Sequence, residues 1–309
     1  MTDRVCRLKT LWLAIGLALS APALLAQPAP AKAPFDGARF SEVSGFDAVP
    51  LNVVAKGEAG RPGVLFVHGY KQSYLSWSAQ FGADLAQRCH LVAYDLRGHG
   101  NSGQPWQASA YDNSRPWAED MAAVIKASGL VKPLVVAWSY GGNVALDFLR
   151  HHAADLPLAG LVLVSSPAGL LPPPAAASAP RPFAGTTDLA RNIAATERAA
   201  GFVFGAGVDA KLQAQLTAAS MRVGPFLDRG AAARGAGNNG DLLPLLKTLP
   251  LTLALGGHDP IVTAPLAQRL RAALPEARVV EFPNSGHALF LDDSAAFNTL
   301  LNELQCSAK

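Results

Sequence analysis

Short, mostly apolar runs alternate with helix-patterned segments along this chain, and this alternation constrains its fold more than any other feature. The runs lie at 63–67, 90–94, 134–137, 161–164, 251–255 and 278–282. Strands that are apolar throughout are buried on both faces, which is typical of a parallel sheet covered by helices on either side. The pattern therefore predicts an α/β fold with a mostly parallel central sheet.

Two further segments, 39–43 and 49–55, alternate polar and apolar residues and precede these runs. Alternation is typical of strands with one solvated face, so they predict a hairpin on the sheet edge. The sheet then has about eight strands. Half of the 309 residues are hydrophobic, which is enough to bury both faces of such a sheet.

The alternation breaks over residues 168–249, which are rich in Pro, Ala and Gly and show no strand pattern. Helical spacing occurs at 189–200 and 210–221, and several phenylalanines need burial. This segment is predicted to be a helical insertion rather than a linker. It divides the core into a first part, 39–167, and a second part, 250–309.

The first 26 residues have the features of a secretory signal peptide. An uncharged, mostly apolar run over 11–26 follows three positive residues, Arg4, Arg7 and Lys9. Small residues allow cleavage after Ala23 or after Ala26, and both sites stay open. A Pro/Ala-rich linker is expected over 27–38.

A membrane anchor is the alternative for this N-terminal segment. The apolar run is shorter than the ~20 residues that a spanning helix needs, and Pro22 interrupts it. We therefore expect a periplasmic or secreted protein without membrane contact after cleavage. The formal charge is only +3 and no other Lys/Arg cluster exists, so no nucleic-acid partner is expected.

Residues 135–142 (VVAWSYGG) place Ser139 where an apolar strand ends and a helix begins. The small residues Ala137 and Gly141 flank it two positions away on each side, as a very sharp turn requires. Such a turn exposes the serine hydroxyl at the carboxyl edge of the sheet. The helix N-terminus behind it favours negative charge. Ser139 is therefore the candidate nucleophile.

This segment resembles the nucleophile elbow of the α/β-hydrolase family, with Ala137 in place of the commonest first glycine. His68-Gly69-Tyr70 resembles the oxyanion loop of that family, although Lys71 stands where many relatives have proline. The resemblance implies an oxyanion hole formed by the backbone N–H groups of Tyr70 and Tyr140. It implies a structural role for His68.

Residues 94–103 (YDLRGHGNSG) resemble the D-x-R-G-x-G-x-S loop of the same family. The loop's role there is mostly structural. The resemblance therefore implies that Asp95, Arg97 and His99 support the scaffold and take no part in the triad.

The family places its acid after the nucleophile, at the end of a later strand. Serines 165 and 166 follow the run at 161–164, whereas Asp259 follows the run at 251–255. The base is expected at His287, on a Ser-Gly loop after the last strand, which gives the order Ser, Asp, His. The rival base is His258, beside the acid. Two other carboxylates, Asp292 and Asp293, are interpreted as helix-start charges.

The resemblance implies the α/β-hydrolase fold, with a helical cap formed by the insertion, and a serine carboxylesterase. A small, moderately hydrophobic ester would be cleaved through an acyl-enzyme. The chemistry needs no metal and no organic cofactor. Perhydrolase or haloperoxidase activity, carbon–carbon bond hydrolysis and acyl transfer use a similar triad and stay open. So does a non-catalytic binding protein on the same fold.

Three cysteines are present, and Cys6 would leave with the signal peptide. In this fold the helix before Cys89 and the last helix, near Cys306, lie on the same sheet face. The resemblance therefore implies a Cys89–Cys306 disulfide, which an oxidising compartment allows. Two separate thiols are the alternative. Acyl-chain length, the alcohol and the oligomeric state cannot be predicted.

Overall fold

The computed structural model describes residues 33–172, 188–205, 207–235 and 237–306. The expected signal peptide, 1–26, lies outside the described residues. The folded unit begins at Ala33, so residues 33–38 of the expected linker belong to it. Phe35 packs its ring against Tyr74 and Phe81, with centroids 5.0 and 5.2 Å apart.

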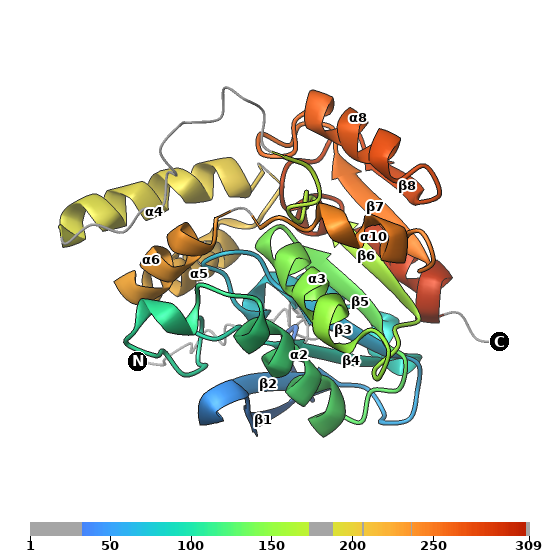
Figure 1. Cartoon of the computed structure of the whole chain (residues 1–309), viewed down its shortest axis with the longest axis horizontal. Coiled ribbons are helices and arrows are strands. Elements are labelled where there is room, and N and C mark those ends of the chain that lie inside the picture. Colours follow the sequence, from blue (N-terminus) through green and yellow to red (C-terminus); the bar gives the residue numbers. More distant parts are fainter. Residues whose placement is uncertain (1–32, 173–187, 206, 236, 307–309) are drawn as a thin grey trace, which may run out of the picture. The chain divides into compact units, whose positions relative to one another are not determined.

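The described chain forms one eight-stranded sheet with the strand order β1-β2-β4-β3-β5-β6-β7-β8 (Figure 1). The strands β1 and β2 form the predicted antiparallel edge hairpin, β2 pairs antiparallel with β4, and all later pairings are parallel. The fold class predicted from the sequence is therefore confirmed. The strands are β1 (Arg39–Ser44), β2 (Pro50–Lys56), β3 (Gly63–Val67), β4 (His90–Tyr94), β5 (Leu134–Trp138), β6 (Gly160–Val164), β7 (Leu251–Gly256) and β8 (Arg278–Phe282).

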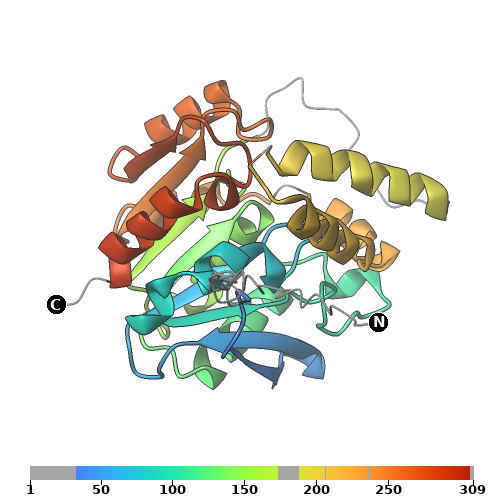
Figure 2. The same cartoon turned by 180° about the vertical axis from the view of Figure 1, so that it is seen from behind.

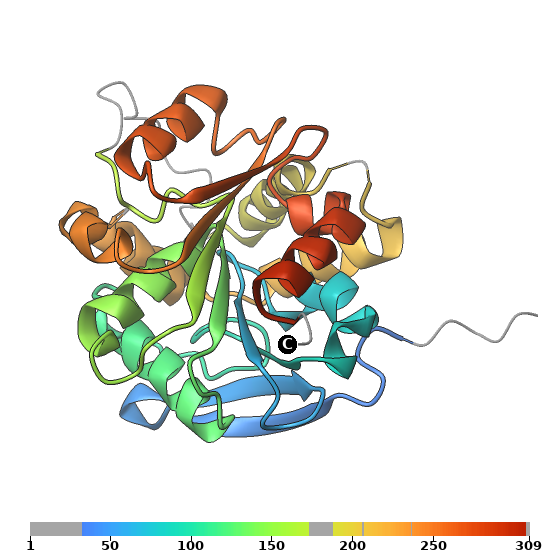
Figure 3. The same cartoon turned by 90° about the vertical axis from the view of Figure 1, so that its right-hand side faces the viewer.

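Helices cover both faces of the sheet (Figure 3). Every residue of β3 to β6 is therefore buried. Successive side chains of a strand point to opposite faces, so Val135 and Ala137 join one core cluster and Val136 and Trp138 the other. The first cluster includes residues of α2 (Arg115–Ala127), α3 (Tyr140–His152) and α8 (Ala264–Ala273). The second includes residues of α1 (Ser78–Gly82), α9 (Leu289–Asp292) and α10 (Ser294–Leu301).

Two helical segments of the core are irregular. The segment over 75–86 is interrupted at Ala83, whose ψ of 173° is extended backbone, and only α1 within it is α-helical. The last helix changes after Leu301 to a wider turn over Asn302–Cys306. That turn ends in a disulfide between Cys306 and Cys89, which confirms the pairing that the resemblance implied.

The described residues of the insertion form three longer helices, which Figures 1 and 2 show grouped together. Two match the helical patterns of the sequence, α4 (Leu189–Val203) and α5 (Ala210–Met221). The third, α6 (Pro225–Arg234), was not predicted, and a short helix, α7 (Leu243–Leu246), leads back to β7. Within the described residues, every helix falls short of the length and apolarity that crossing a membrane requires.

Candidate active site

The turn between β5 and α3 holds Ser139 in a conformation that side chains rarely adopt, with φ 52° and ψ −118°. Small residues make this possible. A Cβ on Gly141 would lie 2.4 Å from the Val67 carbonyl oxygen and 2.8 Å from that of His68. The elbow therefore packs directly against the end of β3.

A second contact from β6 supports the elbow. The Ser166 hydroxyl donates a hydrogen bond to the carbonyl oxygen of Ser139. A Cβ on Gly142 would lie 2.1 Å from that hydroxyl oxygen. Ser166 occupies the position after β6 where the sequence offered no carboxylate, and its supporting role was not predicted.

The three residues predicted as a triad meet at the carboxyl edge of the sheet. The Ser139 hydroxyl lies 2.9 Å from Nε2 of His287. Nδ1 of the same ring lies 3.0 Å from both carboxylate oxygens of Asp259. With the ring proton on Nδ1, the ring donates to Asp259 and Nε2 can accept the serine proton.

The Asp259 carboxylate is held in its charged form. Burial is the largest single influence and acts to raise its pKa, but the hydrogen bond and the electrostatic attraction of His287, together with backbone hydrogen bonds, outweigh it. The backbone N–H groups of Ile261 and Val262 also donate to Oδ1, at 2.8 and 3.0 Å. The net result is a pKa below the usual value, so the carboxylate can stabilise an imidazolium.

The loops that carry Asp259 and His287 are hydrogen-bonded to each other. The His258 N–H donates to the Ser285 carbonyl at 2.9 Å. A Cβ on Gly256 would lie 2.2 Å from the Gly286 carbonyl oxygen, so only glycine allows this approach. His258 itself is exposed, which removes it as the rival base.

Two residues to which the sequence analysis gave no role at the triad orient the His287 loop. The Trp138 indole N–H donates to the His287 carbonyl at 2.9 Å. Oδ2 of Asp292 accepts from the Gly286 N–H at 2.8 Å. The interpretation of Asp292 as a helix-start charge was therefore wrong, because its side chain turns back to the loop. Asp293 does cap α10, accepting from Ala296 N–H at 3.2 Å.

The predicted oxyanion loop lies against the elbow. A Cβ on Gly69 would come within 3.3 Å of the Ser139 Cβ. His68 is buried; it accepts from the Leu96 N–H at 3.0 Å and shares a 2.8 Å contact with the Gly69 carbonyl. Burial lowers its pKa to about 4, so it is uncharged at neutral pH. These contacts fit the structural role implied by the resemblance.

The loop after β4 forms a buried polar scaffold. Arg97 and Asp120 make a paired contact at 2.7 and 2.8 Å, each with 1% of its side chain exposed. Asp95 accepts from the N–H groups of Tyr74 and Asn101, at 2.8 and 2.9 Å. His99 is buried with Nδ1 2.9 Å from the Arg97 carbonyl.

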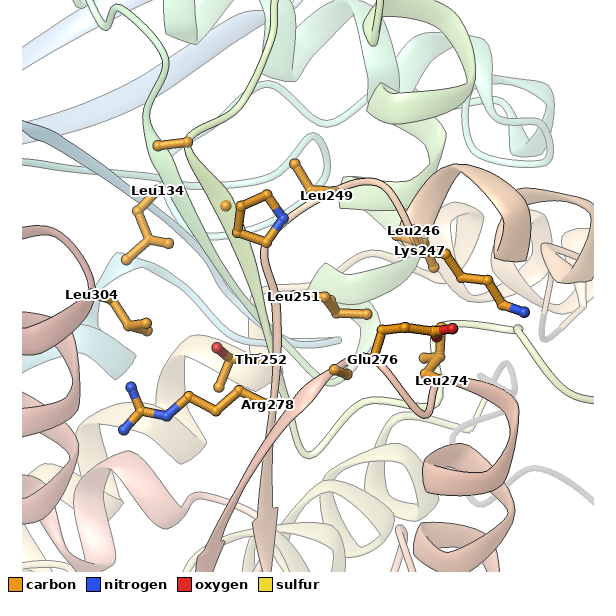
Figure 4. A pocket seen from close by; sticks show the side chains of 14 residues that line it. Leu134, Leu246, Lys247, Leu249, Leu251, Thr252, Leu274, Glu276, Arg278 and Leu304 are labelled. Atoms are coloured by element: carbon orange, nitrogen blue, oxygen red, sulfur yellow. The ribbon is translucent and has the colours of Figure 1, made fainter.

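A pocket of about 270 Å³ lies between the cap helices and reaches the oxyanion loop at Lys71. Its other lining residues come from α4, α5, α6 and the turn between α5 and α6, and include Ile193, Thr196, Met221 and Asp228. A different pocket, of about 320 Å³, lies at the amino ends of β5 to β8 (Figure 4). The length of β5 separates Leu134 in that pocket from Ser139.

Comparisons with known proteins agree with this fold. The model of the alpha/beta hydrolase family matches residues 64–300. A candidate aryl esterase from Burkholderia cenocepacia is 31% identical with a TM-score of 0.77, over 86% of this chain and 97% of that chain. Esterase RhEst1 from Rhodococcus sp. ECU1013 is 27% identical with a TM-score of 0.75, over 85% and 97%.

A third relative matches over a shorter stretch. The bifunctional esterase/perhydrolase DCH of Acinetobacter calcoaceticus is 33% identical over 120 residues, 39% of this chain and 42% of that protein. The family model spans most of the chain, and the two esterase structures cover 86% and 85% of it. The chain therefore belongs to the alpha/beta hydrolase family and is an esterase-like hydrolase.

Proposed function

We propose that the protein is a serine carboxylesterase that cleaves small, moderately hydrophobic esters through an acyl-enzyme. The observation that carries the proposal is the continuous hydrogen-bond chain from Ser139 through His287 to Asp259. A serine hydroxyl is a weak nucleophile unless a base takes its proton during attack.

The proposed reaction has two halves. His287 accepts the Ser139 proton as the oxygen attacks the ester carbonyl, and Asp259 stabilises the resulting imidazolium. The tetrahedral intermediate collapses, and His287 returns the proton to the departing alcohol. Water, activated by the same ring, then attacks the acyl-enzyme and releases the acid.

The oxyanion of each intermediate would be held by the backbone N–H groups of Tyr70 and Tyr140. Tyr140 is the first residue of α3, so its N–H belongs to a helix N-terminus, where negative charge is favoured. One such donor contributes on the order of 3 kcal/mol to the transition state.

Hydrolysis of p-nitrophenyl acetate, butyrate and octanoate by matched variants tests this proposal. Ser139→Ala and His287→Ala should each lose roughly 10⁴-fold or more in kcat. The control is His258→Ala, which removes an exposed histidine beside the triad and should keep the wild-type rate. Wild-type turnover by Ser139→Ala would refute the proposed nucleophile.

A second activity is suggested by the partial match to the bifunctional esterase/perhydrolase. Hydrogen peroxide could replace water in the second half of the reaction, so that the acyl group leaves as a peracid. Peracid formation from an ester and hydrogen peroxide measures this directly. It should disappear with ester hydrolysis in Ser139→Ala, because both reactions would share one acyl-enzyme.

We also propose that the protein is exported. The disulfide between Cys89 and Cys306 supports an oxidising compartment, since disulfides rarely persist in a reducing cytosol. N-terminal sequencing of the protein from an exporting host should begin at Leu24 or at Gln27. A protein that keeps Met1 and remains in the cytosol would contradict export.

A further inference from the structure

The two residues proposed to supply the oxyanion N–H groups both carry tyrosine side chains, and these lie side by side. The rings of Tyr70 and Tyr140 pack edge to face with centroids 5.7 Å apart. Neither tyrosine ring is needed for a backbone N–H to donate. The contacts that these side chains make therefore need their own explanation.

The Tyr70 side chain is held by the cap. Its hydroxyl donates to Oδ1 of Asp228 on α6, and the Lys71 ammonium donates to Oδ2 of the same carboxylate at 2.9 Å. The Asp228 side chain is only 4% exposed and that of Lys71 11% exposed. Hydrogen bonds to a charged partner are roughly twice as strong as neutral ones, more so where water is excluded.

Lys71 adds a reason for the loop to depend on this carboxylate. Its φ of 58° is in the left-handed region, which is unfavourable for a residue with a side chain. The ion pair with Asp228 offsets that cost. Without the pair, the loop could relax and carry the adjacent Tyr70 with it.

The Tyr140 side chain is held by the same helix. Nη1 of Arg234 donates to the Tyr140 hydroxyl at 3.1 Å, and the guanidinium carbon lies 5.7 Å from the ring centroid. Nη2 donates to both carboxylate oxygens of Asp147 on α3. The elbow helix is therefore tied to α6 at two points.

The side chains that hold Tyr70 and Tyr140 both belong to α6, which is closely packed against the core. Asp228 and Arg234 lie six residues apart on α6, whose Leu227 and Ala231 join the main core cluster. A Cβ on Gly230 would lie 2.3 Å from the Ala108 carbonyl oxygen. A helix packed this closely fixes the spacing between its two polar side chains.

We propose that Asp228 and Arg234 are positioning residues, through which α6 of the cap aligns Tyr70 and Tyr140 so that their N–H groups converge on the oxyanion. This rests on the proposed esterase function. On this proposal, the position of the cap on the core is part of the catalytic machinery.

The proposal predicts a loss in the transition state rather than in substrate binding. Misplaced N–H donors stabilise the oxyanion of the transition state less well, but they leave the contacts with the bound substrate in place. The kcat should therefore fall with little change in KM. The affinity for a trifluoromethyl ketone should fall in parallel, because its adduct with serine carries the same oxyanion.

The test compares Asp228→Asn and Arg234→Gln with Arg229→Gln, which removes an exposed charge from the same helix. Folded sites are counted by end-point fluorophosphonate titration, and kcat is expressed per titrated site with p-nitrophenyl acetate. We expect a fall of about tenfold or more in kcat for the first two variants. KM should stay within about twofold, and the inhibition constant of the trifluoromethyl ketone should rise by the factor that kcat loses. Arg229→Gln should match wild type.

A double variant separates positioning from general damage to the fold. Tyr70→Phe removes only the hydroxyl that contacts Asp228, so combining it with Asp228→Asn should cost less than the product of the two single losses. Wild-type kcat per titrated site in Asp228→Asn and Arg234→Gln would overturn the proposal. So would a loss of titratable sites alone, with kcat per site and inhibitor affinity intact. Turnover that survives Ser139→Ala would instead refute the esterase function itself.

Discussion

At the scale of single residues, the active site depends on a few positions near Ser139 that must be small. The sharp turn at Ser139 needs small residues around it, because a Cβ on Gly141 or Gly142 would collide with neighbouring atoms. This requirement is visible in the sequence as Ala137, Gly141 and Gly142, which is why the nucleophile could be predicted from the sequence.

Two glycine substitutions should show this contrast. Gly141→Ala puts a Cβ 2.4 Å from a backbone oxygen that cannot move away, so we expect loss of activity and destabilisation of roughly 3 kcal/mol or more. Gly201→Ala, in α4 where nothing lies within 4 Å, should stabilise the protein by about 0.5–1 kcal/mol. Urea unfolding measures both. Equal effects of the two substitutions would contradict the packing of the elbow.

His68 makes stability depend on pH. Its pKa is lowered by burial from 6.5 to about 4, so below pH 6.5 the unfolded chain binds a proton that the folded chain cannot. This contribution to stability is present above pH 6.5 and is lost as the pH falls toward 4. It amounts to about 2 kcal/mol between pH 7 and pH 5.

The comparison is urea unfolding of wild type and His68→Gln at both pH values. The variant lacks the titrating ring, so its free energy of unfolding should fall by about 2 kcal/mol less than that of wild type. Parallel losses in the two proteins would show that this ring is not the group that titrates.

At the scale of elements, the triad is assembled by loops that follow three different strands, β5, β7 and β8. The loop that carries Asp259 and the loop that carries His287 are hydrogen-bonded to each other, from the His258 N–H to the Ser285 carbonyl. Parallel strands bring their carboxyl ends to one edge, so residues 139, 259 and 287 meet despite their separation in sequence.

Substitutions of two neighbouring aspartates should have different effects, one on catalysis and the other on stability. Asp292→Ala removes the acceptor for the Gly286 N–H, so we expect His287 to be held loosely and kcat to fall about tenfold. Asp293→Ala removes the cap of α10 and should cost about 1 kcal/mol of stability with kcat unchanged. Steady-state kinetics and thermal unfolding of both variants measure this. An unchanged kcat in Asp292→Ala would contradict its role in the loop.

The sequence predicted the strands and the triad, but not the contacts between the cap and the core. Apolar runs and the elbow motif are local patterns, so they can be recognised within ten residues. The helix α6 was missed because its sequence, PFLDRGAAAR, shows no clear amphipathic spacing. The proposed roles of Asp228 and Arg234 depend on their contacts with Tyr70 and Tyr140. Those tyrosines are distant in the sequence, so no local pattern reveals the contacts. Asp292 was misinterpreted because it stands next to Asp293, which does cap a helix.

At the scale of the whole molecule, the disulfide links the segment before β4 to the last turn of the chain. Cys89 and Cys306 lie 217 positions apart in the sequence. A cross-link over such a distance limits the freedom of the unfolded chain far more than that of the folded one. Most of the described chain therefore lies within one covalent ring.

Removal of this disulfide should destabilise the protein without changing the chemistry of the site. We expect Cys306→Ser to lower the free energy of unfolding by about 2–5 kcal/mol, with kcat at 25 °C preserved. Wild type in a reducing agent is the matched control and should show the same loss. Equal stability of the oxidised wild type and the variant would contradict a formed disulfide.

The central claim, that Ser139 is the residue activated by His287 and Asp259, is tested most directly by locating a covalent label. Wild-type protein is treated with a fluorophosphonate, digested, and mapped by mass spectrometry. We predict one label per chain on the peptide containing Ser139, and labelling at least 100-fold slower in His287→Ala. A label on a different residue, or labelling of Ser139→Ala at the wild-type rate, would contradict the account.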